Sequence, residues 1–120
     1  MIKDSLNIIK VGGAIVENEE SLQSLLMSFS SLKGRKILVH GGGKIATEVA
    51  ARLGVETQMI DGRRITSAEM LKVVTMVYGG LVNKNLVARL QALGVNAIGL
   101  TGADLNLIMS VKRPVQPINF

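Results

Sequence analysis

The chain has 120 residues, which is enough for one domain that buries about two thirds of its unfolded surface. It contains no Cys and a single His, which excludes a disulfide framework or a thiolate metal site and disfavours a histidine-based one. The formal net charge of +5 suggests nucleic-acid binding, but the basic residues are scattered and aromatic side chains are scarce, so an anionic small molecule explains the charge better.

The first part of the chain alternates apolar runs with helical patterns. Residues 6–11 and 36–40 are predicted strands, and residues 19–33 and 43–53 have the apolar spacing of helices. This succession is typical of an α/β fold whose parallel strands are joined by right-handed crossovers. No apolar run approaches the roughly 20 residues of a membrane span, and Lys10 interrupts the first one, so we expect a cytoplasmic protein without a membrane contact.

Residues 55–66 break this rhythm. Asp61-Gly62 predicts a two-residue hairpin turn between residues 57–60 and 63–66. Successive strand residues point to opposite faces, so Arg63 and Arg64 cannot both face one ligand. A hairpin that carries two arginines just past its turn is interpreted as a lid or clamp.

A long helix is predicted over residues 67–93. The spacing Thr66-x-x-Glu69 is that of a capping box, and the Gly79-Gly80 pair inside the helix predicts a bend or a close contact. The apolar stripe comprises Met70, Val73, Val74, Val77, Leu81, Leu86, Leu90 and Leu93. Residues 97–100 and 107–111 are predicted strands, and the tail from Pro114 to Phe120 resembles the start of a connection to a further segment.

Three consecutive glycines, Gly41 to Gly43, lie between a predicted strand and a predicted helix. This arrangement exposes backbone N–H donors at the positive end of a helix dipole, where an anion can bind. A Walker A loop is excluded because Ile45 follows Lys44 where a hydroxyl residue is required, and the Rossmann glycine pattern is missing as well. A tight turn without a ligand is the alternative interpretation.

Other polar residues have both a functional and a structural interpretation. Lys10, at the end of the first strand, could stabilise a phosphoryl group or could simply be solvated. Arg64 could grip a substrate carboxylate or lie free on a surface hairpin. We expect His40 to hold the glycine loop, Asp104 to form a turn rather than bind a metal, and the Asn83-Lys84 pair to be a solvated stretch.

Several stretches together, in this order, resemble the amino acid kinase family, and within it the acetylglutamate kinases. They are residues 9–13, 39–43, 61–66, 82–84 and 99–104, and the Gly-x-Arg-Ile-Thr hairpin favours the acetylglutamate kinases in particular. The resemblance implies a three-layer α/β sandwich around a mainly parallel sheet with an inserted β-hairpin lid. It also implies ATP- and Mg²⁺-dependent phosphorylation of the γ-carboxylate of an N-acylated glutamate in arginine biosynthesis.

The resemblance assigns roles to particular residues. Lys10 would stabilise the transferring phosphoryl group, and Gly12 and Gly13 would contact the ATP phosphates. Gly42 and Gly43 would donate N–H groups to the substrate, whose α-carboxylate Arg64 would bind. The helix over residues 67–93 would form a homodimer, and no residue is expected to bind a metal.

Two features depart from the family. Leu105 stands where the family usually has glycine after the aspartate, so the local turn is expected to differ. The resemblance covers only the family's amino-terminal half, so residues 1–120 are expected to form the substrate-binding lobe without the nucleotide lobe. A weakly active or incomplete kinase follows from this, and a binding or dimerisation module without chemistry is the alternative.

Overall fold

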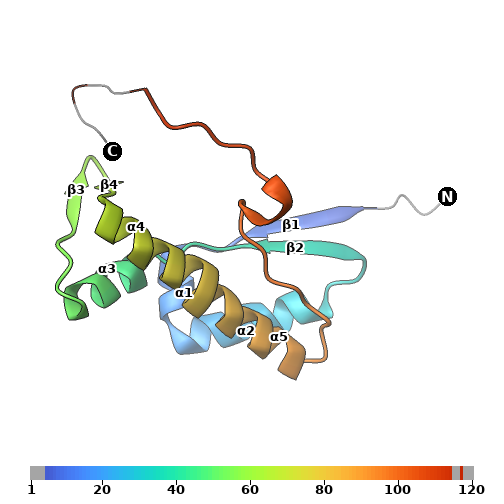
Figure 1. Ribbon diagram of the computed structural model, residues 1–120. Helices are drawn as coiled ribbons and strands as arrows, with labels where there is room; N and C mark the ends of the chain where they lie inside the picture. The colour runs from blue at the N-terminus through green and yellow to red at the C-terminus, as the bar shows by residue number, and fades with distance from the viewer. Residues whose placement is uncertain (1–4, 115–116, 118–120) are drawn as a thin grey trace.

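The structure is a computed structural model that describes residues 5–114 and residue 117. Most of the predicted tail after Pro114 therefore lies outside the described residues. Two parallel strands, β1 (Leu6–Lys10) and β2 (Arg35–Val39), form a sheet in which Leu6 pairs with Arg35 and Lys10 with Val39. An α-helical layer packs on one side of this sheet, which confirms the α/β class and the parallel strand pair (Figure 1).

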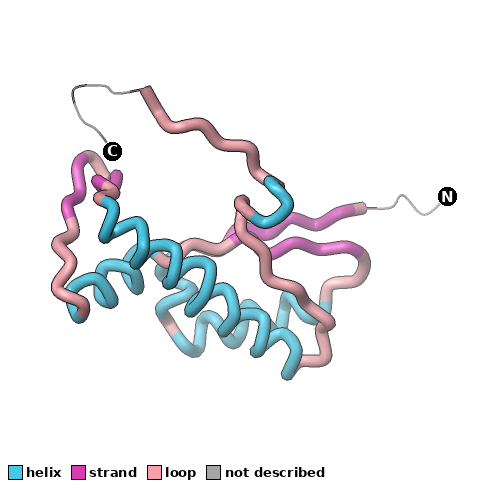
Figure 2. The backbone as a smooth tube through the Cα atoms, viewed as in Figure 1, coloured by secondary structure: helices cyan, strands magenta, loops and turns pink. Residues whose placement is uncertain are grey.

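The helical layer contains the elements that follow each strand. The short helix α1 (Gly13–Glu17) and the helix α2 (Glu19–Ser31) connect β1 to β2, and α3 (Gly43–Arg52) follows β2. The last long helix runs through α4 (Ala68–Val74), a π-helical segment (Thr75–Val82) and α5 (Asn83–Ala92) without interruption (Figure 2). The core between these elements contains Val11, Val16, Leu22, Leu26, Phe29, Ala46, Ala50, Met70, Val73, Val77, Val82, Leu86 and Leu90.

Side-chain contacts fix α2 against its neighbours. The Lys36 ammonium in β2 donates hydrogen bonds to three carbonyl oxygens at the end of α2, including that of Phe29 at 2.8 Å. This places a cation at the negative end of the helix dipole, where it stabilises the helix. At the other end, both guanidinium NH₂ groups of Arg89 in α5 donate to the Glu19 carboxylate at 2.6 and 2.7 Å, which lowers the pKa of Glu19.

The predicted hairpin is confirmed. β3 (Gln58–Ile60) and β4 (Arg63–Ile65) are antiparallel and are joined by Asp61 and Gly62, whose φ angles of 49° and 74° are those of a type I′ turn. Arg64 is half-buried whereas Arg63 is exposed, as the alternation of a strand requires. The hairpin lies at the far end of the molecule from the amino-terminal end of β1 (Figure 1).

The opposite face of the β1–β2 sheet is uncovered by the described residues. Its side chains alternate with those that face the helices, and Ile8 on this face is 64% exposed. The predicted strands over residues 97–100 and 107–111 are wrong, because neither segment pairs with another strand in the described part of the chain. Ile98 and Val111 in these segments remain 81% and 92% exposed. A strand needs a hydrogen-bonded neighbour, and apolar composition alone does not supply one.

The start of the long helix differs from the predicted capping box. Ser67 is the N-cap, and its hydroxyl accepts a hydrogen bond from the backbone N–H of Met70 at 3.1 Å. Glu69 pairs with Lys72 at 2.9 Å instead of turning back to the cap. The Thr66 hydroxyl contacts the carbonyl oxygen of Arg64 at 3.5 Å.

We therefore expect Ser67→Ala, and not Thr66→Ala, to destabilise the protein. Loss of the cap leaves a backbone donor without its partner and should lower the free energy of unfolding by about 1 kcal/mol. Urea denaturation followed by circular dichroism measures this change. An equal or larger effect of Thr66→Ala would show that the cap lies one residue earlier than in this structure.

Candidate functional site

The parallel pairing of β1 and β2 brings both glycine turns to one edge of the sheet. Lys10 pairs with Val39, and the backbone N–H of Val11 donates to the Val39 carbonyl oxygen at 2.8 Å. The carboxyl ends of parallel strands meet at the same edge, where ligands of open α/β sheets bind. The turn at Gly12-Gly13 and the turn at residues 41–43 are thus neighbours.

The first turn is open to solvent. Lys10 ends β1 and is exposed, and Gly12 is exposed with no other atom within 4 Å of the position that a Cβ would take. Gly13 begins α1, close to the Glu17 carboxylate, which forms a 3.4 Å ion pair with Lys44 of α3. This ion pair joins the two short segments that follow the glycine turns.

The second turn is packed from behind. A Cβ at Gly42 would lie 2.8 Å from Cδ1 of Tyr78 and 3.1 Å from Cγ2 of Val82. Gly42 is buried, and the Tyr78 hydroxyl would lie 3.5 Å from a Cβ at Gly43. The middle glycine is therefore required by packing against the π-helical segment, which the sequence alone does not reveal.

Arg64 reaches this second turn from the hairpin. Its Nη2 donates to the Gly43 carbonyl oxygen at 2.8 Å and to the Thr47 hydroxyl at 2.9 Å. Its Nη1 makes only longer contacts, with the Thr57 hydroxyl at 3.4 Å and with Sδ of Met70 at 3.7 Å. The structure thus brings Arg64 to Gly43, and one terminal nitrogen of the guanidinium, Nη1, has only weak partners.

A polar network lies beside the same turn. His40 places Nδ1 2.9 Å from the Gly41 carbonyl oxygen and Nε2 3.0 Å from the side-chain nitrogen of Asn83. Asn83 also donates to the Leu100 carbonyl oxygen at 3.3 Å and accepts from the Lys84 ammonium at 2.9 Å. The expectation that Asn83 is solvated is wrong, because this side chain is only 6% exposed. A polar pair inside an apolar helical stripe was the signal that could have revealed it.

The segment after α5 supplies further hydrogen-bond partners to this network. Lys84 donates to the Gly99 carbonyl oxygen at 2.9 Å, and a Cβ at Gly99 would collide with the Asn83 side chain. The Asp104 carboxylate accepts from the backbone N–H and the hydroxyl of Thr101 at 2.5 and 2.8 Å. These hydrogen bonds, with a smaller contribution from Lys84, lower the pKa of Asp104. Asp104 is therefore a turn former, as expected.

Leu105 follows this turn with a left-handed backbone. Its φ of 51° costs a non-glycine residue about 1 kcal/mol, and the next residue, Asn106, also has a positive φ of 53°. Leu105 thus has a backbone conformation that suits glycine better than leucine.

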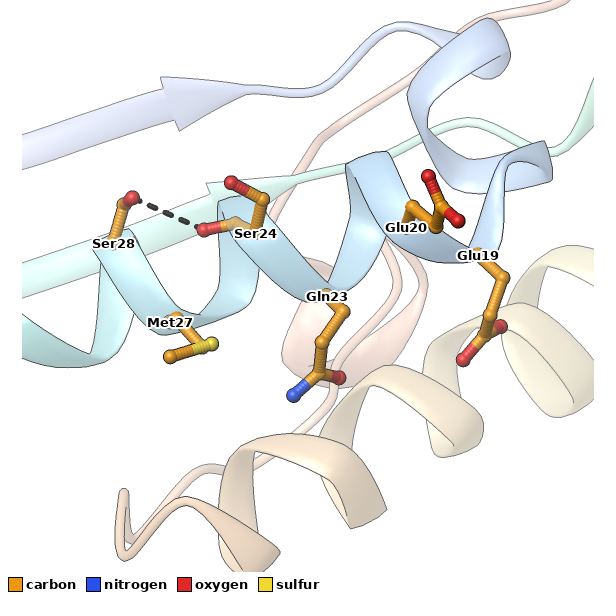
Figure 3. A pocket seen from close by; sticks show the side chains of 6 residues that line it. All are labelled: Glu19, Glu20, Gln23, Ser24, Met27 and Ser28. Atoms are coloured by element: carbon orange, nitrogen blue, oxygen red, sulfur yellow. Dashed lines mark hydrogen bonds between the residues drawn. The ribbon is translucent and has the colours of Figure 1, made fainter.

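The charge at this edge is positive. Lys10 ends the strand before the first turn, and Arg64 donates to Gly43 of the second turn. Residues 5–114 contain no group of three His, Asp or Glu side chains that could hold a metal. A hollow of about 640 Å³ lies elsewhere, along one side of α2, where the Ser28 hydroxyl donates to the Ser24 carbonyl oxygen (Figure 3). The open backbone of the glycine turns, the Arg64 guanidinium and the Lys10 ammonium lie at one sheet edge and can bind an anionic group. The α2 hollow has none of these groups.

Comparison with known proteins identifies related sequences. A model of the amino acid kinase family matches residues 5–119. Proteins named acetylglutamate kinase are 66% identical in Phocaeicola vulgatus and 63% identical in Bacteroides thetaiotaomicron, each over 99% of this chain and 46% of the relative. One from Methanopyrus kandleri is 43% identical over 90% of this chain and 41% of its own length. The chain thus spans about half the length of these relatives.

A solved structure supports the fold. The crystal structure of smu.665 from Streptococcus mutans UA159 superposes with a TM-score of 0.62 at 27% identity, covering 75% of this chain and 37% of that protein. Among the described residues, no helix has the length and apolar character of a membrane span.

Proposed function

Because the chain belongs to the amino acid kinase family, we propose that residues 1–120 form the amino-terminal, substrate-binding lobe of an enzyme that phosphorylates N-acetyl-L-glutamate on its γ-carboxylate. The observation that carries this proposal is the meeting of both glycine turns with Arg64 at one sheet edge. The identity of 66% to a protein named acetylglutamate kinase supports the substrate and the step in arginine biosynthesis.

In the proposed complex, the second turn binds the amino-acid substrate. Gly42 and Gly43 donate backbone N–H groups to it, and Arg64 binds its α-carboxylate. The long contacts of Arg64 Nη1, at 3.4 and 3.7 Å, support this role because a carboxylate replaces them at little cost. Nη2 meanwhile stays bonded to Gly43 and Thr47, so that the guanidinium is held in place.

The first turn binds the phosphate donor in this proposal. Gly12 and Gly13 contact the ATP phosphates, and the exposed Lys10 ammonium approaches the transferring group. A γ-carboxylate oxygen attacks the γ-phosphorus while the bond to the ADP oxygen breaks, and no proton needs to be removed from the nucleophile. Lys10 stabilises negative charge on the transferring phosphoryl oxygens. His40 holds the loop and transfers no proton in this step.

Mg²⁺ is expected to accompany ATP. Because no acidic cluster lies within the described ranges, the ion would be held mainly by the phosphates and by groups outside them. We propose that this ATP-consuming reaction takes place in the cytoplasm.

We propose that the full enzyme is a three-layer sandwich with the β3–β4 hairpin as its lid. The uncovered face of β1 and β2 and the unpaired segments over residues 97–100 and 107–111 support this arrangement, since further strands and helices would bury their apolar side chains. A carboxy-terminal half would supply most of the nucleotide site, so turnover is expected to need it.

A dimerisation module without chemistry is the second candidate. The long helix exposes Leu71, Met76 and Leu81, which are 56%, 52% and 48% exposed, on the outside of the molecule. Gly80 on the same helix has no other atom within 4 Å of a Cβ position, so a second helix could approach closely. This supports a homodimer through residues 67–93, with or without kinase activity.

A hydroxylamine-trapping assay for acyl phosphate tests the kinase proposal. The chain is incubated with Mg-ATP and N-acetyl-L-glutamate, alone and with the carboxy-terminal half of the Phocaeicola vulgatus relative. We expect product only with the added half. Lys10→Ala should lower the rate about 100-fold or more, because it removes charge stabilisation of the transition state. Lys33→Ala, which changes an exposed lysine at the end of α2, is the matched control.

The possible outcomes separate the candidates. Product from the chain alone, lost in Lys10→Ala, would support the kinase and refute the need for a second half. Substrate binding without product in any mixture would favour the binding or dimerisation module. If the folded protein shows neither binding nor product, the kinase proposal is refuted.

A further inference from the structure

The side chains of His40, Asn83 and Lys84 form a hydrogen-bonded network whose central residue, Asn83, is buried. It joins three separate parts of the chain: the residue before the glycine loop, the helix after the π segment, and the backbone at Gly99 and Leu100. Asn83 is the buried polar residue at its centre, and all of its side-chain hydrogen-bonding groups have partners. We propose that Lys84 and Asn83 fix the tautomer of His40, and that these positioning residues thereby hold the glycine loop of residues 41–43 in place.

The charge of Lys84 determines the orientation of the Asn83 amide. An ammonium group has three donors and no acceptor, so the Asn83 atom 2.9 Å from it must be the amide oxygen. The amide nitrogen then faces Nε2 of His40 at 3.0 Å and the Leu100 carbonyl oxygen at 3.3 Å. Because an amide nitrogen only donates, Nε2 must be the acceptor and carry no proton.

The protonation of the other ring nitrogen, Nδ1, follows from this assignment. A neutral imidazole with a bare Nε2 carries its proton on Nδ1, which lies 2.9 Å from the Gly41 carbonyl oxygen. That carbonyl can only accept, so the Nδ1–H tautomer completes the chain of donors. With the Nε2–H tautomer, two donors would face each other at Asn83 and two acceptors would face each other at Gly41.

The network acts on the loop from one side while Tyr78 and Val82 hold it from the other. Gly41 is held through its carbonyl oxygen by His40, and Gly42 packs on the Tyr78 ring. A loop fixed on both sides presents its N–H groups in one arrangement, which reduces the ordering cost when a ligand binds. The consequence for the substrate rests on the proposed function, whereas the tautomer and the loop geometry do not.

The single histidine of the chain makes a direct measurement possible. Long-range ¹H–¹⁵N correlation spectra of the ¹⁵N-labelled protein at alkaline pH distinguish a protonated from a bare ring nitrogen. We expect Nδ1 to be protonated and Nε2 to be bare. The opposite pattern would overturn the proposal, whatever the protein binds.

Substitution of Lys84 tests the direction of control. Lys84 is exposed, so Lys84→Met should fold, and only the longer bond to the Leu100 carbonyl oxygen, at 3.3 Å, then holds the Asn83 amide in its orientation. The amide can therefore turn over in part of the molecules and accept from an Nε2–H tautomer. We expect the ring to shift toward that tautomer and the Gly41 and Gly42 amides to exchange several-fold faster with solvent. Lys72→Met, on the same helix but paired with Glu69, should change neither signal. An unchanged ring in Lys84→Met, or a changed ring in Lys72→Met, would overturn the assigned role of Lys84.

A titration with N-acetyl-L-glutamate, followed through the glycine amide signals, adds the functional result. In Lys84→Met a hydrogen bond that orders the loop is lost, so the dissociation constant should rise about tenfold. In Lys72→Met it should stay unchanged. Equal affinities despite a shifted tautomer would show that the network does not position the loop. Absence of binding by the unsubstituted protein would count against the proposed function alone, because the tautomer and exchange data would still decide the network.

Discussion

Replacing Gly99 by alanine is expected to lower the free energy of unfolding by about 2–4 kcal/mol. A Cβ there would lie 2.8 Å from Cγ2 of Val87 and 2.9 Å from Cγ of Asn83, and it would collide with the Asn83 amide oxygen. Neither neighbour can move away freely, because Val87 is β-branched and Asn83 holds its partners through hydrogen bonds. The new methyl group would therefore add strain and also break buried hydrogen bonds.

Urea denaturation of Gly99→Ala and Gly80→Ala measures this effect with a matched control. Gly80 lies inside the long helix, whereas Gly99 lies in the segment after α5. No other atom lies within 4 Å of the Cβ position of Gly80, and alanine favours a helix by up to about 1 kcal/mol. We therefore expect Gly80→Ala to be neutral or stabilising. A Gly99→Ala variant within about 0.5 kcal/mol of the parent protein would contradict the packing described here.

The second large effect is expected for Arg64→Lys, which keeps the charge but removes the guanidinium. A lysine cannot bond the Gly43 carbonyl oxygen and the Thr47 hydroxyl at once while also offering a second nitrogen to a ligand. We expect a loss of about 1–3 kcal/mol in unfolding free energy from the broken charged hydrogen bonds. In the proposed function, affinity for N-acetyl-L-glutamate should fall by about 10- to 100-fold.

Calorimetric titration and urea denaturation measure the two losses separately. Arg63→Lys is the matched control, since Arg63 is the neighbouring arginine and its side chain is exposed on the other face of β4. Loss of affinity in both variants to the same degree would indicate a general charge effect. Reduced stability in Arg64→Lys without any change in affinity would restrict Arg64 to holding the hairpin against α3.

The parts of the fold that the sequence predicted correctly depend on local chemistry. Asp61 and Gly62 specify a type I′ turn by themselves, and glycines after apolar runs end β1 and β2 where expected. Parallel pairing then follows from the intervening helices, and it brings Lys10 and the two glycine turns to one edge. The meeting of Arg64 with Gly43 follows from the hairpin's place after α3 and could be anticipated only as a clamp.

The errors have a different origin. The apolar stripe of the long helix was assigned with a constant helical period, which counted Leu81 as buried and left out Val82. In the structure Leu81 is 48% exposed and Val82 only 3%, because residues 75–82 are π-helical. The wider turn shifts the inward face by one position, and this places Asn83 inside. Only the polar pair Asn83-Lys84 inside the apolar stripe distinguishes this stretch from a regular α-helix.

The two missing strands illustrate the need for long-range partners. Residues 97–100 and 107–111 have strand-like composition, but pairing depends on neighbours that the described part of the chain does not offer them. Local propensity is therefore a necessary condition for a strand and not a sufficient one.

The π-helical segment makes the length of the long helix as important as its composition. Buried positions advance from Val77 to Val82 by five residues and then by four to Leu86 and again to Leu90. Deleting one residue between Val77 and Val82, such as Gly80, would make this advance four residues, which is the spacing of a uniform α-helix, so the buried face would stay in register. Asn83 would then keep its place beside His40, and α5 would turn the same surface to the core. We therefore expect the fold to tolerate a single-residue deletion inside the π-helical segment and not inside α4 or α5, where a deletion would rotate the following residues by about 100°.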